Sequence, residues 1–169
     1  MKKRILSIIS LLILISLFAV SCGNDANTST NPTPTPKRFF FSHWFLNNGN
    51  DKIEVSTADD VSPIKKDVLI RLSINPNDVT CNAKISAVSA SNPALEPSDF
   101  TLSKTSGITT DYEMTISLSS TGIQKIKTAS KGVPIEYTIT LELETSSDQT
   151  ENKITSRDIN ISVLALSQS

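Results

Sequence analysis

The chain has 169 residues, with 16 Lys and Arg against 17 Asp and Glu, so its net charge at neutral pH is −1. This length suits about one domain. A balanced charge without Lys/Arg clusters argues against a nucleic-acid partner.

Residues 1–21 predict a signal peptide. A basic start at Lys2, Lys3 and Arg4 precedes an apolar run from Ile5 to Val20, which ends just before Cys22. As a helix this run would cover about 24 Å, less than the roughly 30 Å of a bilayer's hydrocarbon core. The pattern therefore favours a cleaved secretion signal over an uncleaved anchor. Cleavage would leave 13 basic and 17 acidic residues, a net charge of −4.

The four residues Ala19-Val20-Ser21-Cys22 resemble the lipobox of bacterial lipoproteins. That family usually has Leu where this chain has Ala19, and Ala19 also fits ordinary secretion. The resemblance implies that Cys22 carries lipid, including acyl chains such as palmitate, and anchors the mature chain to a membrane of the cell envelope. Gly23 stands where an Asp would favour the inner membrane, so we expect the outer membrane in a cell that has one. A plainly secreted chain is the alternative.

Residues 22–38 predict a flexible tether behind the lipidated cysteine. The segment is almost free of apolar side chains and ends in alternating Pro and Thr, a composition that stays extended and solvated. The domain itself is expected at 39–166, with a polar tail at 167–169.

An aromatic run at 39–46 predicts the first strand, followed by a turn at 47–50 and a hairpin into a strand at 52–57. Both faces of this strand are apolar. One face, with Phe39, Phe41 and Phe45, can enter the core. The other is a candidate interaction surface that either is buried by the domain itself or meets lipid head groups or a protein partner. It consists of Phe40, Trp44 and Leu46.

From residue 51 onward, apolar residues alternate with a period of two, which predicts successive strands. We expect strands at 52–57, 67–74, 82–89, 99–103, 111–119, 134–145 and 156–166, with Ala83, Ile85 and Ala87 facing inward in the third of these. The exception is 120–131, where Ile123 and Ile126 are three apart; this spacing predicts a helical turn with Lys125, Lys127 and Lys131 as a small exposed patch. The predicted core includes Ile70, Leu72, Ile116, Ile139, Leu141 and Ile161.

About seven antiparallel strands separated by turns predict an all-β sandwich. The alternation from Ile53 to Leu166 resembles immunoglobulin-like and cadherin-like modules of bacterial surface proteins, without the Cys/Trp/Cys signature of antibody domains. Tyr137 lies early in the penultimate strand, where such folds place a tyrosine corner.

The sequence offers no convincing catalytic group and no cofactor site. His43, the single histidine, lies far from Cys81, and together they are too few for a structural zinc site. We expect Cys81 to be a buried, inert thiol, Glu142 and Glu144 to point to water, and the acidic loops at Asp59-Asp60 and 75–78 to be turns. The prediction is a lipid-anchored, non-enzymatic envelope protein with a binding or support role, whose unknown ligand is a protein, a glycan or another envelope component. A structural accessory subunit is the alternative, and an envelope hydrolase is less favoured.

Overall fold

The computed structural model describes residues 34–46, 51–56, 67–89, 91–129 and 131–166. All of its helices and strands lie in one compact unit from Thr35 to Ser169. The predicted signal peptide and Cys22 lie outside the described residues, as do the turn at 47–50 and Asp59-Asp60.

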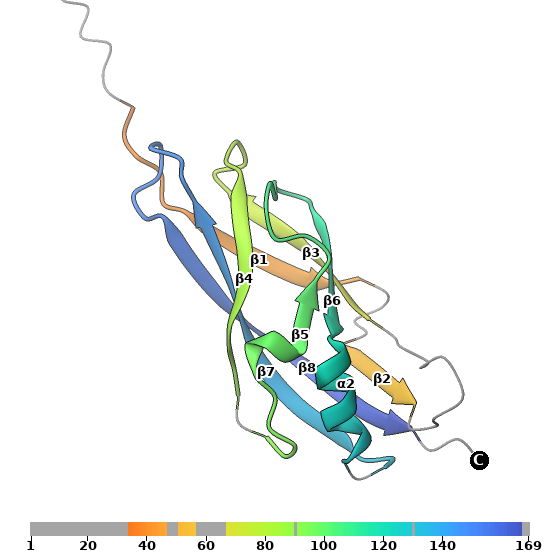
Figure 1. Cartoon of the computed structure of the whole chain (residues 1–169). Coiled ribbons are helices and arrows are strands. Elements are labelled where there is room, and N and C mark those ends of the chain that lie inside the picture. Colours follow the sequence, from red (N-terminus) through yellow and green to blue (C-terminus); the bar gives the residue numbers. More distant parts are fainter. Residues whose placement is uncertain (1–33, 47–50, 57–66, 90, 130, 167–169) are drawn as a thin grey trace, which may run out of the picture. The chain divides into compact units, whose positions relative to one another are not determined.

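The elements follow one another as strands with one short helical insertion and one α-helix (Figure 1). In chain order they are β1 (Phe40–Phe45), β2 (Lys52–Ser56), β3 (Val68–Asn75), β4 (Cys81–Val88), the 3-10 turn η1 (Pro97–Asp99), β5 (Phe100–Leu102), β6 (Glu113–Leu118), α2 (Ser120–Lys127), β7 (Pro134–Thr145) and β8 (Ile154–Leu166).

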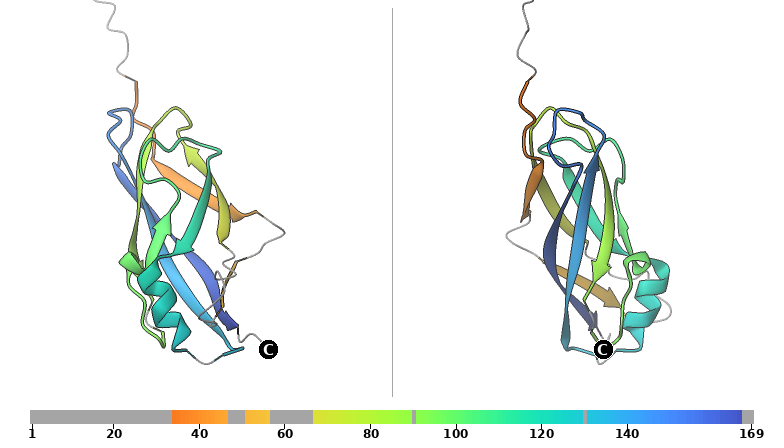
Figure 2. Two further views of the ribbon diagram at one scale, coloured as in Figure 1. Left: turned by 45° about the vertical axis from the view of Figure 1, so that its right-hand side comes forward. Right: turned by 90° about the vertical axis from the view of Figure 1, so that its left-hand side faces the viewer.

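The strands of the described residues form two sheets of four, in the orders β1-β3-β6-β5 and β2-β8-β7-β4. Neighbours are antiparallel, except that β2 runs parallel to β8. If β1 and β2 are taken as two halves of one first strand, this is the strand order of an immunoglobulin constant domain. Figure 2 shows the two layers, with α2 near one end. The expected all-β sandwich is confirmed.

Alternation along the strands builds the core between the sheets. In β3 every second residue from Val68 to Ile74 is buried, because side chains of successive strand residues point to opposite faces. The same holds for β7, where Ile139, Leu141 and Leu143 are inaccessible to solvent. All six predicted core residues are fully buried, so this part of the prediction is confirmed.

The expected hairpin between the aromatic strand and 52–57 is wrong. β1 pairs with β3 in one sheet, whereas β2 pairs with β8 in the other. The chain therefore crosses between the layers after Leu46, which lets Phe41 enter the core from one sheet and Ile53 from the other. A turn-forming segment such as 47–50 is compatible with either path.

Two smaller expectations are also wrong. Ala87 is exposed rather than inward, because β4 contains a bulge between Ile85 and Ala87 that changes which side chains face the core. The three lysines near α2 do not form one exposed patch, since Lys125 Nζ is 2.7 Å from Oδ2 of the buried Asp99.

The helix α2 confirms the predicted helical turn. Its N-cap is Ser119, whose Oγ accepts a hydrogen bond from the Gly122 N–H at 3.2 Å. Gly122 and Ile126 are its buried residues. The helix packs on η1, where a Cβ on Gly122 would stand only 2.5 Å from the Asp99 carbonyl oxygen.

Tyr137 is buried early in β7, at the predicted position. Its hydroxyl donates to the Pro93 carbonyl at 2.6 Å. A tyrosine corner bonds to the backbone a few residues upstream, whereas this bond spans 44 residues and ties β7 to the β4–η1 connection.

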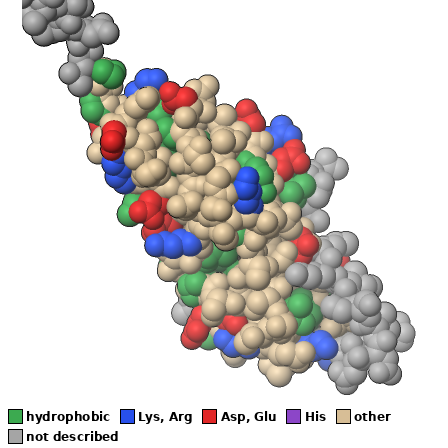
Figure 3. Space-filling view, turned by 45° about the horizontal axis from the view of Figure 1, so that its top comes forward, with side chains coloured by type: hydrophobic (Ala, Val, Ile, Leu, Met, Phe, Trp, Pro, Cys, Tyr) green, Lys and Arg blue, Asp and Glu red, His purple; other side chains and the backbone are tan. Residues whose placement is uncertain are grey.

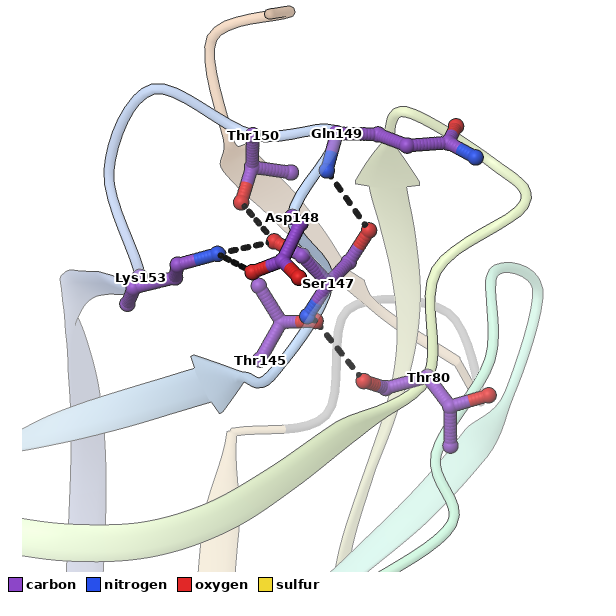
Figure 4. A network of polar contacts seen from close by, with 7 residues as sticks. All are labelled: Thr80, Thr145, Ser147, Asp148, Gln149, Thr150 and Lys153. Atoms are coloured by element: carbon purple, nitrogen blue, oxygen red, sulfur yellow. Dashed lines mark hydrogen bonds and ion pairs between the residues drawn. The ribbon is translucent and has the colours of Figure 1, made fainter.

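The segment that precedes β1 enters the sandwich beside the loop between β7 and β8. Hydrogen bonds among Thr145, Ser147, Gln149, Thr150 and Lys153 order this loop (Figure 4). The Lys37 N–H then donates to the Gln149 carbonyl at 2.8 Å, and the Lys37 carbonyl accepts from Glu151 N–H at 2.9 Å. The segment before β1 is therefore fixed at this end, and α2 lies toward the other end (Figure 1).

Candidate interaction surface

The strand β1 separates its aromatic residues by face. Phe39, just before β1, and Phe41 are 1% and 0% exposed, whereas Phe40 and Trp44 are 40% and 41% exposed. The sheet holds one face against the core and leaves the other outside. The possibility that the domain buries both faces is therefore wrong.

Leu46, the third residue of the predicted surface, follows directly after β1 and is half-buried. Its N–H donates to the Leu69 carbonyl at 2.8 Å, which extends the pairing with β3 by one more bond. We call Phe40, Trp44 and Leu46 the aromatic surface. Its two exposed rings are four residues apart on one strand, about 13 Å along the sheet.

The neighbours of the aromatic surface on β3 are polar. Phe40 lies opposite Asn75, and Trp44 opposite Arg71. The Arg71 guanidinium forms an ion pair with Glu113 of β6, and its Nε is shielded from solvent and has no hydrogen-bond partner among the described residues. Arg71, which lies opposite Trp44, is thus neutralised by the Glu113 carboxylate on the same face.

His43 and Phe45 lie on the inner side of β1 and are half-buried. Their rings meet edge to face, with centroids 5.9 Å apart. Burial, and after it the charge of Arg157, lowers the pKa of His43, so the imidazole is neutral at neutral pH. This environment matches a packed strand residue.

Cys81 is the first residue of β4 and is 1% exposed. Burial raises the pKa of its thiol to about 11, so the group stays protonated at neutral pH. The expected buried, unreactive thiol agrees with this position.

Glu142 and Glu144 line a shallow hollow on the outer face of β7, together with Asn82, Ala83 and Lys84. Lys84 Nζ lies 2.8 Å from Glu142 Oε1, and this hydrogen bond raises the pKa of Lys84. The alternation of β7 gives Leu141 and Leu143 to the core, as predicted, which leaves both carboxylates on the solvent side.

Within the described ranges, no group of three or more His, Cys, Asp or Glu side chains is arranged to hold a metal ion. Among the same residues no helix is long and apolar enough to cross a membrane. On the face shown in Figure 3, positive and negative side chains are interspersed, with small apolar areas between them.

A family model, the MBG domain, matches residues 67–161, which is more than half of the chain. The chain belongs to the MBG domain family. MBG domains are structural rather than enzymatic modules, and this membership agrees with the sandwich described above. The matched residues run from the start of β3 into β8.

Other comparisons add little. No curated protein matches the chain. One similar solved structure is the CooA pilin subunit from enterotoxigenic Escherichia coli, with 14% identity over 73% of this chain and 98% of the pilin chain, at a TM-score of 0.34.

The aromatic surface precedes the residues matched by the MBG model. β1 and β2 are the edge strands of the two sheets and also precede the matched part. The sequence signal that located the surface was the clustering of aromatic residues. What the sequence did not reveal was the ion pair beside Trp44, since Arg71 and Glu113 are 42 residues apart.

Proposed function

We propose that this MBG-domain chain is a lipid-anchored envelope protein with a non-enzymatic binding role, and that the aromatic surface binds an envelope partner. The observation that carries the binding role is the exposure of Phe40 and Trp44 on a strand whose other face is locked into the core. Exposed aromatic side chains on a rigid element lose little conformational freedom when they bind, and they dominate many interfaces.

A protein or glycan partner fits the Trp44 end of this surface better than lipid head groups, which would meet the exposed cations Lys37 and Arg38 only at the Phe40 end. Anionic lipids attract unpaired Lys and Arg next to interfacial aromatic residues. Here the cation opposite Trp44 is paired with Glu113, and the flanking side chains on β3 are Ser73 and Asn75. Uncharged hydrogen-bonding groups between two rings suit a polypeptide or a neutral sugar.

The anchor rests on the sequence around Cys22. Two or three acyl chains there would hold the protein on the membrane, because each buried methylene contributes about 0.8 kcal/mol. Intact-mass measurement and detergent partitioning of the natural chain against Cys22→Ser test it. We expect the natural chain to carry added lipid mass and enter the detergent phase, and equal partitioning of both into water would reject the anchor.

The binding role is tested by crosslinking in the native envelope. We expect Trp44→Ser together with Phe40→Ser to abolish a specific crosslinked product. The control is Val133→Ser together with Ile154→Ser, which removes two somewhat more exposed apolar side chains, at 55% and 52%, from elsewhere. A product that survives the first pair of changes, or is lost with both pairs, would contradict the assignment to the aromatic surface.

A structural accessory subunit without a ligand of its own is the second candidate, favoured by the structural character of MBG domains. It predicts one stoichiometric complex that co-purifies with the lipidated chain. That complex would persist after both aromatic residues are replaced.

A further inference from the structure

The backbone of β1 presents two edges with different surroundings. Trp44 is paired with Arg71 of β3, and the next even-numbered residue, Leu46, donates its N–H to Leu69 of the same strand. Since backbone groups alternate in direction along a strand, even-numbered residues of β1 face β3 and odd-numbered residues face the outer edge.

The first half of this outer edge is covered by side chains from the β8 side. Asn152 accepts from the Phe39 N–H and donates to its carbonyl, both at 2.9 Å. Arg157 Nε donates to the Phe41 carbonyl at 3.1 Å. Such caps are a normal way to keep a sheet edge from pairing with another chain.

Among the described residues, none caps the second half of the edge in this way. In the described part of the chain, no residue forms a hydrogen bond to the outward N–H and C=O groups of His43 and Phe45. Beside them on the outer face stands Trp44, 41% exposed. An edge that the described residues leave open next to a large apolar side chain is a site for strand pairing.

The outer edges of β4 and β5 are protected from strand pairing in other ways. In β4, backbone bonds from Ile108 and Thr105 cover Cys81 and Ala83, and a bulge follows at Ile85. β5 has three residues only. Short strands, covering loops and bulges all discourage pairing at an edge.

We propose that the second half of β1 is a homotypic interface, where β1 of a second copy of this chain pairs antiparallel with it. The register that uses the open groups joins His43 of each copy to Phe45 of the other. Each of these two pairs exchanges both backbone hydrogen bonds. The axis of symmetry then passes between the two Trp44 residues.

The occupant is a second copy because this edge is complementary to itself. The two open residues lie symmetrically around Trp44, so one two-fold operation satisfies all four pairs of groups. Trp44 and its counterpart form the narrow, non-hydrogen-bonded type of pair, with Cα atoms about 4.5 Å apart. Their indole rings would then lie side by side on the outer face of the sheet. The pairing would also bring two copies of the aromatic surface onto one continuous sheet.

Cysteine crosslinking at three positions of the same face tests this register. In a Cys22→Ser chain, Cys81 is the remaining thiol and is buried. Trp44→Cys places two thiols within the 4.4–6.8 Å Cα separation of a disulfide. At about 3.4 Å per residue, Ser42→Cys would place its Cα pair roughly 14 Å apart, and Phe40→Cys roughly 27 Å apart, both too far.

We expect mild oxidation to give a reducible dimer on a non-reducing gel for Trp44→Cys, and none for Phe40→Cys or Ser42→Cys. Phe40 is the matched control, because it has the same exposure on the same face of the same strand. Dimers at all three positions would indicate random collision, and no dimer at Trp44→Cys would show that the edge is empty or bound by another chain. Either result overturns the proposal.

Sedimentation of the Cys22→Ser chain provides a second measurement without new thiols. Its mass should rise with concentration from one chain to two, and Trp44→Ser should shift this transition to higher concentration while Phe40→Ser does not. A chain that stays monomeric throughout contradicts the proposal, and leaves the lipid anchor and the envelope partner to their own tests.

Discussion

Tyr137 places a phenol in the interior of the sandwich, where its hydroxyl has one acceptor, the Pro93 carbonyl, and its ring meets Phe100 edge to face. Burial, and after it the charge of Asp99, raises the pKa of Tyr137 from 10.0 to about 12. The folded state therefore resists ionisation of this group more than the unfolded state does.

This shift predicts a specific loss of stability at alkaline pH. The contribution is fully present below pH 10, the unfolded value, and is lost as pH rises through 12, the folded value. Two pKa units correspond to about 2–3 kcal/mol in total. Denaturant unfolding at pH 8 and pH 11 measures it. Tyr137→Phe should be less stable at pH 8 by about 0.5–1.5 kcal/mol, the worth of one hydrogen bond, and should lose less than the natural chain between the two pH values. Parallel losses would rule out Tyr137 as the source.

Burial raises the pKa of the Cys81 thiol as well, so this thiol should react slowly. With a pKa of about 11, the thiolate fraction at pH 8 is roughly 100-fold below that of a free thiol, before burial slows access further. In a Cys22→Ser chain, alkylation by iodoacetamide should be at least roughly 100-fold slower in buffer than in denaturant. Comparable rates in the two conditions would mean that the start of β4 opens readily.

At the scale of elements, the contact between α2 and η1 depends on one glycine. A Cβ at Gly122 would stand 2.5 Å from the Asp99 carbonyl oxygen and 3.1 Å from a Leu118 methyl group. The backbone at Asp99 is also held by the Ser119 N–H, which donates to that carbonyl at 2.7 Å. The helix must therefore move away if the Cβ is added.

Gly122→Ala should destabilise the domain even though alanine favours helices. The overlap costs about 1–3 kcal/mol, whereas the helix propensity of Ala returns about 1 kcal/mol. Gln124→Ala, at an exposed position of the same helix, is the control and should change stability by less than about 0.5 kcal/mol. Chemical denaturation measures both. Stabilisation by Gly122→Ala would show that α2 docks less tightly than described.

The sheets themselves were predictable because alternation with a period of two reports burial directly. The strands around Ile70, Ile116 and Ile139 and the helical turn at 120–131 followed from spacing alone. The partner of each strand did not, since pairing is decided by contacts far apart in sequence. The crossing of the chain between β1 and β2 and the bulge in β4 are both such long-range outcomes.

At the candidate site, too, local sequence patterns predicted some features, and contacts distant in sequence decided the others. Clustered aromatic residues located the surface, and alternation predicted that Phe40 and Trp44 share a face. Whether this face would be covered depended on the sheet order, which left it at an outer surface beside the Arg71–Glu113 pair. The open edge at His43 and Phe45 depended on which side chains of β8 reach β1, and no local pattern encodes that.

At the scale of the whole molecule, one end of the sandwich is bonded to the segment that precedes β1, and α2 lies toward the other end. Lys37 is bonded into the β7–β8 loop at Gln149 and Glu151, so the preceding segment joins the domain at that end. The strand β8 starts after this loop and has 13 residues, and α2 packs against β8 and β2. At about 3.3 Å per residue, β8 alone spans roughly 40 Å.

If Cys22 is anchored as proposed, the loop end should lie nearer the membrane than the α2 end. Whether the 15 residues from Cys22 to Lys37 are coiled, with a root-mean-square reach of roughly 20 Å, or extended, with a reach of about 47 Å, they attach at the loop end and so hold it nearer the lipid on average. In a chain reconstituted through its lipid, a fluorophore on Asp148→Cys should be quenched by nitroxide head groups more strongly than one on Gln124→Cys. Both sites are exposed, so the labels themselves are matched. Equal quenching would mean that the domain lies flat on the bilayer, and stronger quenching at Gln124→Cys would mean that the α2 end faces the lipid. Either outcome would reject the idea that the entry point alone orients the domain.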